Sequence, residues 1–195
     1  CILDLIRNRK NVIVVGSTGS GKTTFLNAIL KKLSELVPEH RLLILEDTRE
    51  LQYSSPDVER MTTSGNKETK VTLQDLVFVS LRLSPDRIII GEVRDKSAYD
   101  VLKAWNTGHS GGFCTIHADS TVDAFSRLEL LIRESSQASE TPTIRSIIGA
   151  SVDAIISIQK KVTQKGTKRL IEDIILVDRY DPLTNGFVYK HVKNA

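Results

Sequence analysis

A glycine-rich segment preceded by a short apolar run most narrowly limits the folds open to this chain. Residues 12–24 read VIVVGSTGSGKTT, in which four apolar residues lead into the pattern G-x-x-x-x-G-K-[ST]. The apolar run is typical of a buried parallel strand, and the pattern is that of a phosphate-binding loop between a strand and a helix. Together they predict an α/β protein with a parallel sheet.

The loop pattern carries its own chemistry. In such a loop, backbone amides and the start of the following helix point at anionic oxygens, while the lysine adds a positive charge. Lys22 takes that position here, and the hydroxyl of Thr23 can bind magnesium. The residues predicted to surround phosphate groups are Gly16, Ser17, Thr18, Gly19, Ser20, Gly21, Lys22, Thr23 and Thr24. The sequence thus predicts a nucleotide site, and an ordinary strand-to-helix turn is the alternative.

Apolar patterns of helices and strands alternate after the loop. Helical spacing recurs at residues 25–37, 72–84, 98–107 and 122–133, and strand-like runs lie at 41–47, 87–91 and 112–117. Thr72 and Asp75 form a capping box for the second helix, which is expected to stop at Pro85. The polar segment 52–70 is expected to be an extended loop with room for one short strand, and Trp105 is expected in the core. This alternation predicts a parallel sheet covered by helices.

The last third of the chain changes character. A polar linker at residues 134–140 leads to a short helix near 144–150. Three strand-like runs separated by turns then follow at residues 152–160, 169–178 and 187–192. They predict an antiparallel meander added to the sheet. We therefore predict an α/β fold of three layers, with helices on both faces of a mostly parallel sheet and a C-terminal antiparallel meander.

Composition bounds the class of protein. The chain has 195 residues, of which 40% are hydrophobic and 26% charged, and this suits one globular domain. Its apolar runs are far shorter than the roughly 20 residues that cross a bilayer, so we expect no transmembrane segment. Cys1 and Cys114 are too few for a disulfide framework, which favours a cytoplasmic location. A net charge of +3 does not favour direct DNA binding.

An acidic segment, LEDTREL, follows the second predicted strand and contains Glu46, Asp47 and Glu50. Ligands bind at the carboxyl edge of an open parallel sheet, so these carboxylates are expected beside the phosphate loop. Magnesium is predicted on Thr23, Asp47 and Glu46, partly through water, and Glu50 is the first choice for the carboxylate that contacts water. A solvated loop rich in charge is the alternative.

The segment RIIIGEVRD ends its strand in Gly91 and Glu92, without the aspartate that often precedes the glutamate at metal-dependent phosphate sites. Glu92 is expected to emerge near the terminal phosphate, where it can polarise the attacking water. Magnesium keeps several of its waters, so the acidic segment and the loop threonine can compensate for the missing aspartate. The alternative is a salt bridge from Glu92 to Arg94 or Arg87.

Two histidines flank a predicted strand in TGHSGGFCTIH. His109 lies in a glycine-rich loop and His117 at the end of the strand. They are predicted to sense the terminal phosphate or a neighbouring subunit, and structural histidines are the alternative. A zinc site with Cys114 is disfavoured, because Cys114 and His117 should face opposite sides of the strand.

The segment KKVTQKGTKR, residues 160–169, gathers five basic residues on a predicted hairpin. It could contact acidic lipid or nucleic acid, but a solvated hairpin is more typical of such a segment.

Read in order, four motifs resemble the signature of the secretion ATPases, the RecA-like motors of type II and type IV secretion, type IV pili and conjugation. They are the phosphate loop, LEDTREL, SPDRIIIGEVRD and GHSGGFCTIHA. The segment WNTGHSGG closely resembles the Trb-type conjugative-transfer ATPases. The resemblance runs from about Leu5 to about Val177, and in this family the missing aspartate is the normal state. The four-cysteine metal module of type II secretion ATPases has no counterpart in the sequence.

The resemblance implies a RecA-like domain that spans residues 1–195, a further N-terminal domain outside this chain, and a homo-hexameric ring in the full-length protein. The start at Cys1, with the phosphate loop so close behind it, agrees with this expectation. ATP and Mg²⁺ are the implied cofactors, with nucleotide held at the domain boundary. The implied catalytic residues are Glu92, Glu50, Lys22, His109, His117 and Arg94.

The resemblance also implies a function. The expected role is an ATP-hydrolysing motor that powers a type IV secretion or conjugative DNA transfer apparatus. Its partners would be other components of that apparatus at the inner membrane, and its location would be cytoplasmic, on the inner membrane face. The alternatives are a nucleotide-gated assembly module with little turnover, a motor that acts on DNA directly, and a motor of type IV pili or type II secretion.

Overall fold

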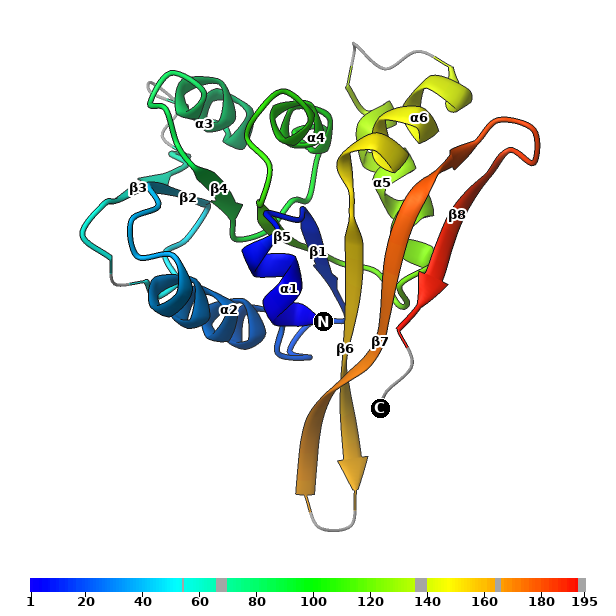
Figure 1. Ribbon diagram of the computed structural model, residues 1–195, viewed down its shortest axis with the longest axis horizontal. Coiled ribbons are helices and arrows are strands. Elements are labelled where there is room, and N and C mark those ends of the chain that lie inside the picture. Colours follow the sequence, from blue (N-terminus) through cyan, green and yellow to red (C-terminus); the bar gives the residue numbers. More distant parts are fainter. Residues whose placement is uncertain (54, 66–69, 136–139, 164–165, 193–195) are drawn as a thin grey trace.

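The computed structural model describes residues 1–53, 55–65, 70–135, 140–163 and 166–192. Within them, one sheet has the strand order β3-β2-β4-β5-β1-β6-β7-β8 (Figure 1). The strands are β1 (Val12–Val15), β2 (Leu42–Glu46), β3 (Val58–Thr62), β4 (Arg87–Ile90), β5 (Phe113–Ile116), β6 (Ala154–Thr163), β7 (Gly166–Asp181) and β8 (Gly186–His191). The helices are α1 (Ile2–Arg7), α2 (Lys22–Leu36), α3 (Leu73–Ser80), α4 (Ala98–Asn106), α5 (Asp123–Arg133) and α6 (Thr141–Ser151).

The six strands from β3 to β6 in this order pair in parallel, and β7 and β8 continue the sheet as an antiparallel meander. Strands β1, β2 and β4 are buried along their whole length, as their apolar sequences predict. Both the mostly parallel sheet and the C-terminal meander predicted from the sequence are therefore confirmed.

Helices cover both faces of the sheet (Figure 1). Alternate residues of β1 point to opposite faces of the sheet. Val12 and Val14 pack with α1 and α2, whereas Ile13 and Val15 pack with the helices from α3 to α6. The buried indole of Trp105 belongs to the second of these cores, as expected. This arrangement confirms the predicted three layers.

The register of the strands determines which loops meet. Val15 at the end of β1 is opposite Ile116 at the end of β5, and Leu45 of β2 is opposite Ile90 of β4. Because parallel strands end at the same edge, the segments that follow these four strands lie side by side. The phosphate loop, the acidic segment, Glu92 and His117 therefore converge on one edge of the sheet.

Helix α3 differs from its prediction at its C-terminal end. Its start is confirmed, because Thr72 and Asp75 exchange the hydrogen bonds of a capping box. The helix ends at Ser80 rather than at Pro85. The backbone N–H of Leu83 reaches only to the carbonyl of Ser80, and Ser84 has φ of +51°, so the chain leaves the helix in a tighter turn.

Two short elements expected from the sequence are present. The short strand foreseen in the polar segment 52–70 is β3, and the short helix near 144–150 is α6. The sequence did not indicate α1, which buries Leu5 and Ile6 against the core. The centre of the polar linker (136–139) and the tip of the basic hairpin (164–165) lie outside the described residues. Within the described part of the chain, no helix is long and apolar enough to span a bilayer.

Candidate functional site

The loop between β1 and α2 requires glycine at the positions that the motif prescribes. Gly16, Gly19 and Gly21 have φ of +150°, +72° and +106°, which side-chain-bearing residues rarely adopt. A Cβ atom on Gly16 would also lie 2.3 Å from the carbonyl oxygen of Ile158, because β6 runs close behind the loop. The loop ends where α2 begins at Lys22, so the amides of the helix N-terminus face the space beyond it.

Lys22 folds back onto the loop. Its Nζ donates hydrogen bonds to the carbonyl oxygens of Gly16, at 2.7 Å, and Ser17, at 3.1 Å. The side chain is buried, and this burial lowers the pKa of Lys22, while the charge of Glu92 raises it in part. A bound phosphate would offer the ammonium a stronger partner than these neutral carbonyls.

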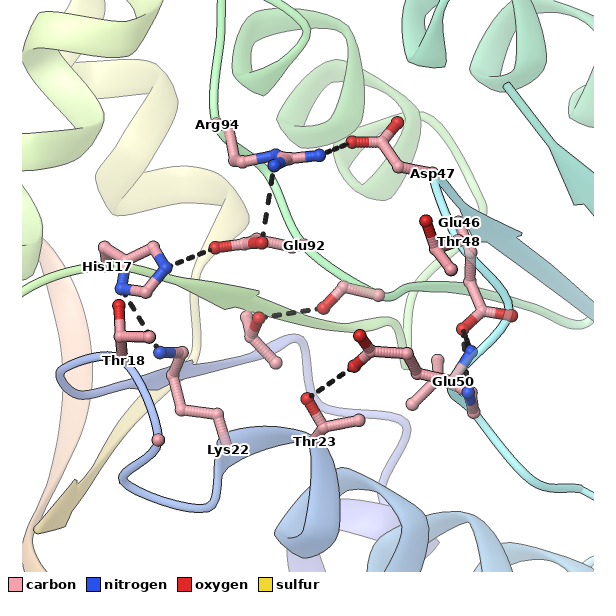
Figure 2. A pocket seen from close by; sticks show the side chains of 14 residues that line it. Thr18, Lys22, Thr23, Glu46, Asp47, Thr48, Glu50, Glu92, Arg94 and His117 are labelled. Atoms are coloured by element: carbon pink, nitrogen blue, oxygen red, sulfur yellow. Dashed lines mark hydrogen bonds and ion pairs between the residues drawn. The ribbon is translucent and has the colours of Figure 1, made fainter. Parts of the chain in front are cut away.

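His117 links Lys22 to Glu92 (Figure 2). Its Nδ1 lies 3.3 Å from Lys22 Nζ, and its Nε2 lies 2.7 Å from Oε1 of Glu92. A lysine ammonium can only donate, so Nδ1 accepts, and the proton of a neutral imidazole then sits on Nε2. The contact of Nε2 with Oε1 has the distance of an ion pair but not the geometry of a hydrogen bond. The register of β1 and β5 produces this arrangement, because it places the end of β5 beside the phosphate loop.

Arg94 joins Glu92 to the acidic segment. Its guanidinium forms a short ion pair with Asp47, and its Nε lies 3.8 Å from Oε2 of Glu92. The alternative salt bridge from Glu92 to Arg94 is thus present, in addition to the contact with His117. Arg87 takes no part, because it is fully buried and donates to backbone carbonyls at the other end of its strand.

The three predicted acidic residues have different positions. The side chain of Glu50 reaches the start of α2, where its Oε2 is 3.3 Å from the hydroxyl of Thr23. Glu46 is buried, and its Oε1 accepts hydrogen bonds from the backbone N–H groups of Glu50 and Leu51. Asp47 is held by the ion pair to the guanidinium described above. The structure therefore brings Glu50, and neither of the other two carboxylates, to the predicted magnesium-binding hydroxyl.

These side chains line a cavity of about 410 Å³. Figure 2 shows the labelled side chains facing a common space from the phosphate loop, the start of α2 and the carboxyl ends of β2, β4 and β5. The lining residues are Thr18, Gly19, Lys22, Thr23, Glu46, Asp47, Thr48, Glu50, Leu51, Gly91, Glu92, Arg94, Thr115 and His117. A glycine-rich cradle with a lysine suits phosphate groups, and the oxygens of Thr23 and Glu50 are the hard ligands that Mg²⁺ prefers. The residues present therefore fit a nucleotide with its magnesium ion.

The remaining predicted loop residues frame the cradle rather than line the cavity. They are Gly16, Ser17, Ser20, Gly21 and Thr24. Ser20 is fully buried against Gly16, since a Cβ there would lie 2.6 Å from its Oγ. Such packing holds the loop in shape, so that its backbone and the side chains of Thr18, Lys22 and Thr23 are presented to a ligand.

His109 is not brought to this cavity. It precedes β5, whereas His117 follows it, so the two histidines lie at opposite edges of the sheet. Its Nδ1 lies 3.4 Å from the carbonyl oxygen of Pro85. This placement also argues against the zinc alternative, together with the burial of Cys114, which raises the pKa of its thiol. No cluster of three possible metal ligands occurs among the described residues.

The glycines that follow His109 have packing roles of their own. A Cβ on Gly112 would lie 2.0 Å from Nε1 of Trp105, and one on Gly111 would lie 2.5 Å from a guanidinium nitrogen of Arg87. The segment WNTGHSGG therefore closes the amino edge of the sheet against buried side chains, and packing explains the glycines at positions 111 and 112 without a ligand.

Sequence reasoning missed Arg169 of β7 as part of this site. Its Nε lies 3.4 Å from the carbonyl oxygen of Gly19, and a Cβ on Gly21 would lie 2.8 Å from its Cδ. The guanidinium thus covers the outer side of the phosphate loop. The basic hairpin at residues 160–169 was the feature of the sequence that could have indicated this contact, but a solvated hairpin was favoured there.

Known proteins resemble this chain over most of its length. The chain matches the family model described as type II/IV secretion system protein over residues 2–180. It is 41% identical over 179 residues to the conjugal transfer protein TrbB of Rhizobium radiobacter, a match that covers 92% of this chain and 52% of that protein. It is 33% identical over 159 residues to the type IV secretion system protein VirB11 of Bartonella henselae, covering 80% of this chain and 44% of that protein. The chain thus spans about half the length of these curated relatives.

Solved structures agree with these relatives. The VirB11 ATPase of the Brucella suis type IV secretion system, crystallised in complex with sulphate, has a TM-score of 0.79 at 28% identity, covering 89% of this chain and 50% of that chain. The pilus retraction motor PilT with bound ADP shares the fold, with a TM-score of 0.72 at 24% identity, covering 87% of this chain and 48% of that chain. The RecA-like fold and the resemblance to Trb-type proteins are thereby confirmed. The chain belongs to the type II/IV secretion system protein family.

Proposed function

We propose that this chain is the ATP-binding and ATP-hydrolysing domain of a motor that powers a type IV secretion or conjugative DNA transfer apparatus. The observation that carries the proposal is the contact chain from Lys22 through His117 to Glu92, in the same cavity as the phosphate loop. The kind of apparatus is inferred from two relatives, which are named as the conjugal transfer protein TrbB and the type IV secretion system protein VirB11.

Each side chain in the cavity has a distinct role in this proposal. The loop amides and Lys22 bind the phosphates, and Thr23 and Glu50 hold Mg²⁺, the second of them through water. When bound, Mg²⁺ neutralises charge on the phosphate oxygens. Glu92 orients and polarises the attacking water, while His117 keeps the carboxylate in place and faces the terminal phosphate. Arg94 holds the acidic segment beside Glu92.

The complete protein is proposed to work as a homo-hexamer on the cytoplasmic face of the inner membrane. Ring ATPases commonly complete each site with arginines from a neighbouring domain or subunit, and such a residue supplied in trans contributes about 10³ to 10⁵ in rate. The cavity described above opens at the sheet edge, where another domain or subunit can reach it. Its partners are other components of the apparatus, and direct contact with DNA is not required.

The test compares the complete gene product with its Lys22→Ala variant. We expect magnesium-dependent ATP hydrolysis by the first, measured as released phosphate. We expect the variant to bind nucleotide roughly ten- to a hundredfold more weakly, because it loses a hydrogen bond to a charged group. Magnesium-dependent nucleotide binding without turnover would favour the assembly-module alternative, and equal activity in both proteins would contradict the proposed site.

A further inference from the structure

Glu46 fills the place that a longer side chain at position 91 would need. It ends β2, and Gly91 follows β4, the neighbouring strand in the sheet. The three atoms nearest to a Cβ built on Gly91 would all belong to Glu46: its Cγ at 3.2 Å, and its Cβ and Oε1 at 3.7 Å. An aspartate at position 91, the residue absent from this strand, would therefore place its Cβ closer to the glutamate than ordinary contact allows. Glu46 and Gly91 form one packing unit in which the carboxylate comes from the adjacent strand.

The carboxylate of Glu46 is committed to the backbone of the acidic segment. It is 3% exposed, and its Oε1 accepts from the N–H of Glu50 at 2.8 Å and from the N–H of Leu51 at 2.7 Å. Two charge-assisted hydrogen bonds to adjacent amides fix the direction in which the chain turns. Glu46 is therefore anchored at the base of the cavity rather than free to approach an ion.

The turn that Glu46 fixes determines where Glu50 points. Leu51 is buried in the core beneath it, and Glu50 extends from the same turn to the hydroxyl of Thr23, at 3.3 Å. Asn27 of α2 reinforces this arrangement, since its Nδ2 lies 3.3 Å from the carbonyl oxygen of Glu50. The side chain that reaches the predicted magnesium site is thus held in position by a second carboxylate that does not reach it.

We infer that Glu46 is a positioning residue: it holds Glu50 at Thr23 through the two backbone amides, and it is not a ligand of magnesium. This inference rests on the proposed function for its catalytic consequence, and it revises the expectation that Glu46 binds the metal. The positioning role requires only an oxygen acceptor at the place of Oε1. A carboxylate that bound magnesium would instead depend on its negative charge.

This difference sets the test. Glu46→Gln keeps an acceptor oxygen and the length of the side chain but removes the charge, whereas Glu46→Ala removes both. In the complete gene product, we expect Glu46→Ala to lower ATP turnover about 10- to 100-fold, as loss of a supporting hydrogen-bond partner does at metal sites. We expect Glu46→Gln to recover most of that loss and to need no more Mg²⁺ than the wild type. A glutamine variant as impaired as the alanine variant, with a raised Mg²⁺ requirement, would overturn the inference.

A second readout does not depend on ATP hydrolysis. Hydrogen exchange of the Glu50 and Leu51 amides should be slow in the wild type and in Glu46→Gln, and fast in Glu46→Ala. Fast exchange in the wild type would refute the positioning role even if the enzyme were active. Slow exchange together with no ATPase activity in the wild type would instead refute the proposed function.

Gly91→Ala is a milder probe in case Glu46→Ala fails to fold. The atoms nearest to the added methyl group would be those of Glu46, so it should displace this side chain by a few tenths of an ångström and speed exchange at the same two amides. The double variant should be no worse than Glu46→Ala alone, because both changes act through one unit. Additive effects of the two changes would contradict the shared unit.

Discussion

Nε2 of His117 lies 2.7 Å from Oε1 of Glu92, so the candidate catalytic carboxylate is held by an imidazole whose other nitrogen faces the phosphate-loop lysine. A phosphate that draws Lys22 away from the loop carbonyls would also change the contact at Nδ1. The histidine can therefore transmit the state of the phosphate site to the carboxylate that orients water.

Replacement of His117 should affect turnover more than binding. We expect His117→Ala to lower kcat about 10- to 100-fold, because Glu92 loses the partner that orients it. His117→Gln should lose less, since its amide can still donate to the carboxylate. Steady-state kinetics and equilibrium nucleotide binding on both variants provide the check, and an alanine variant with wild-type kcat would rule out this role.

Nucleotide affinity should fall at alkaline pH because of Lys22. Burial lowers the pKa of this ammonium, whereas bound phosphate favours its charged form. Above the lowered pKa, binding must take up a proton, so affinity should fall by up to about tenfold per pH unit, starting at less alkaline pH than for an ordinary lysine.

Equilibrium binding of ADP with magnesium across an alkaline series measures this slope. Circular dichroism at each pH verifies that the chain stays folded. Lys22→Met is the matched control, which should bind more weakly and show no such slope. A flat affinity for the wild type throughout the folded range would contradict the assignment of Lys22.

Arg169 should contribute to nucleotide binding from outside the cavity. It is exposed, so we expect Arg169→Ala to weaken binding only roughly two- to fivefold. Lys161→Ala is the control, because Arg169 pairs with Lys160 across the hairpin and Lys161 therefore faces the opposite side. Equal effects of the two substitutions would show that the hairpin acts only through its total charge.

The sequence predicted the elements whose signals are local. The apolar run of β1, the glycine pattern after it and the capping box at Thr72 each depend on neighbours in the chain, and each occurs as expected. The alternation of elements was sufficient to place Glu92 and His117 at one edge of the sheet, because parallel strands share their direction.

What the sequence could not predict depends on contacts between distant segments. The sequence favoured Glu50 for contact with water but could not show that Glu46 is anchored by two backbone amides beside Gly91 while Glu50 reaches Thr23. The sequence placed His109 and His117 at the two ends of one strand but assigned both to the same site, which only His117 reaches. The contact between Arg169 and the phosphate loop joins residues that are 150 positions apart in the sequence, so no local pattern could indicate it.

Assembly should control activity in the complete protein. If a neighbouring domain or subunit completes each site, specific ATPase activity of the complete gene product should rise with protein concentration, while residues 1–195 alone should remain a poor catalyst at every concentration. A dilution series of both proteins, with their masses followed by light scattering, gives the comparison. Equal activity that does not change with concentration would show that no partner completes the site.

The most direct test of the whole account is the Glu92→Gln variant of the complete gene product, with nucleotide binding and ATP hydrolysis measured on the same preparation. The amide preserves the size of the side chain but is a poor proton acceptor, so kcat should fall about 10²- to 10⁴-fold. Affinity for ATP with magnesium should change little, because Lys22 and the loop amides bind the phosphates. If the variant binds and hydrolyses ATP as the wild type does, Glu92 is only the ion-pair partner of His117 and Arg94, and the proposed active site is wrong.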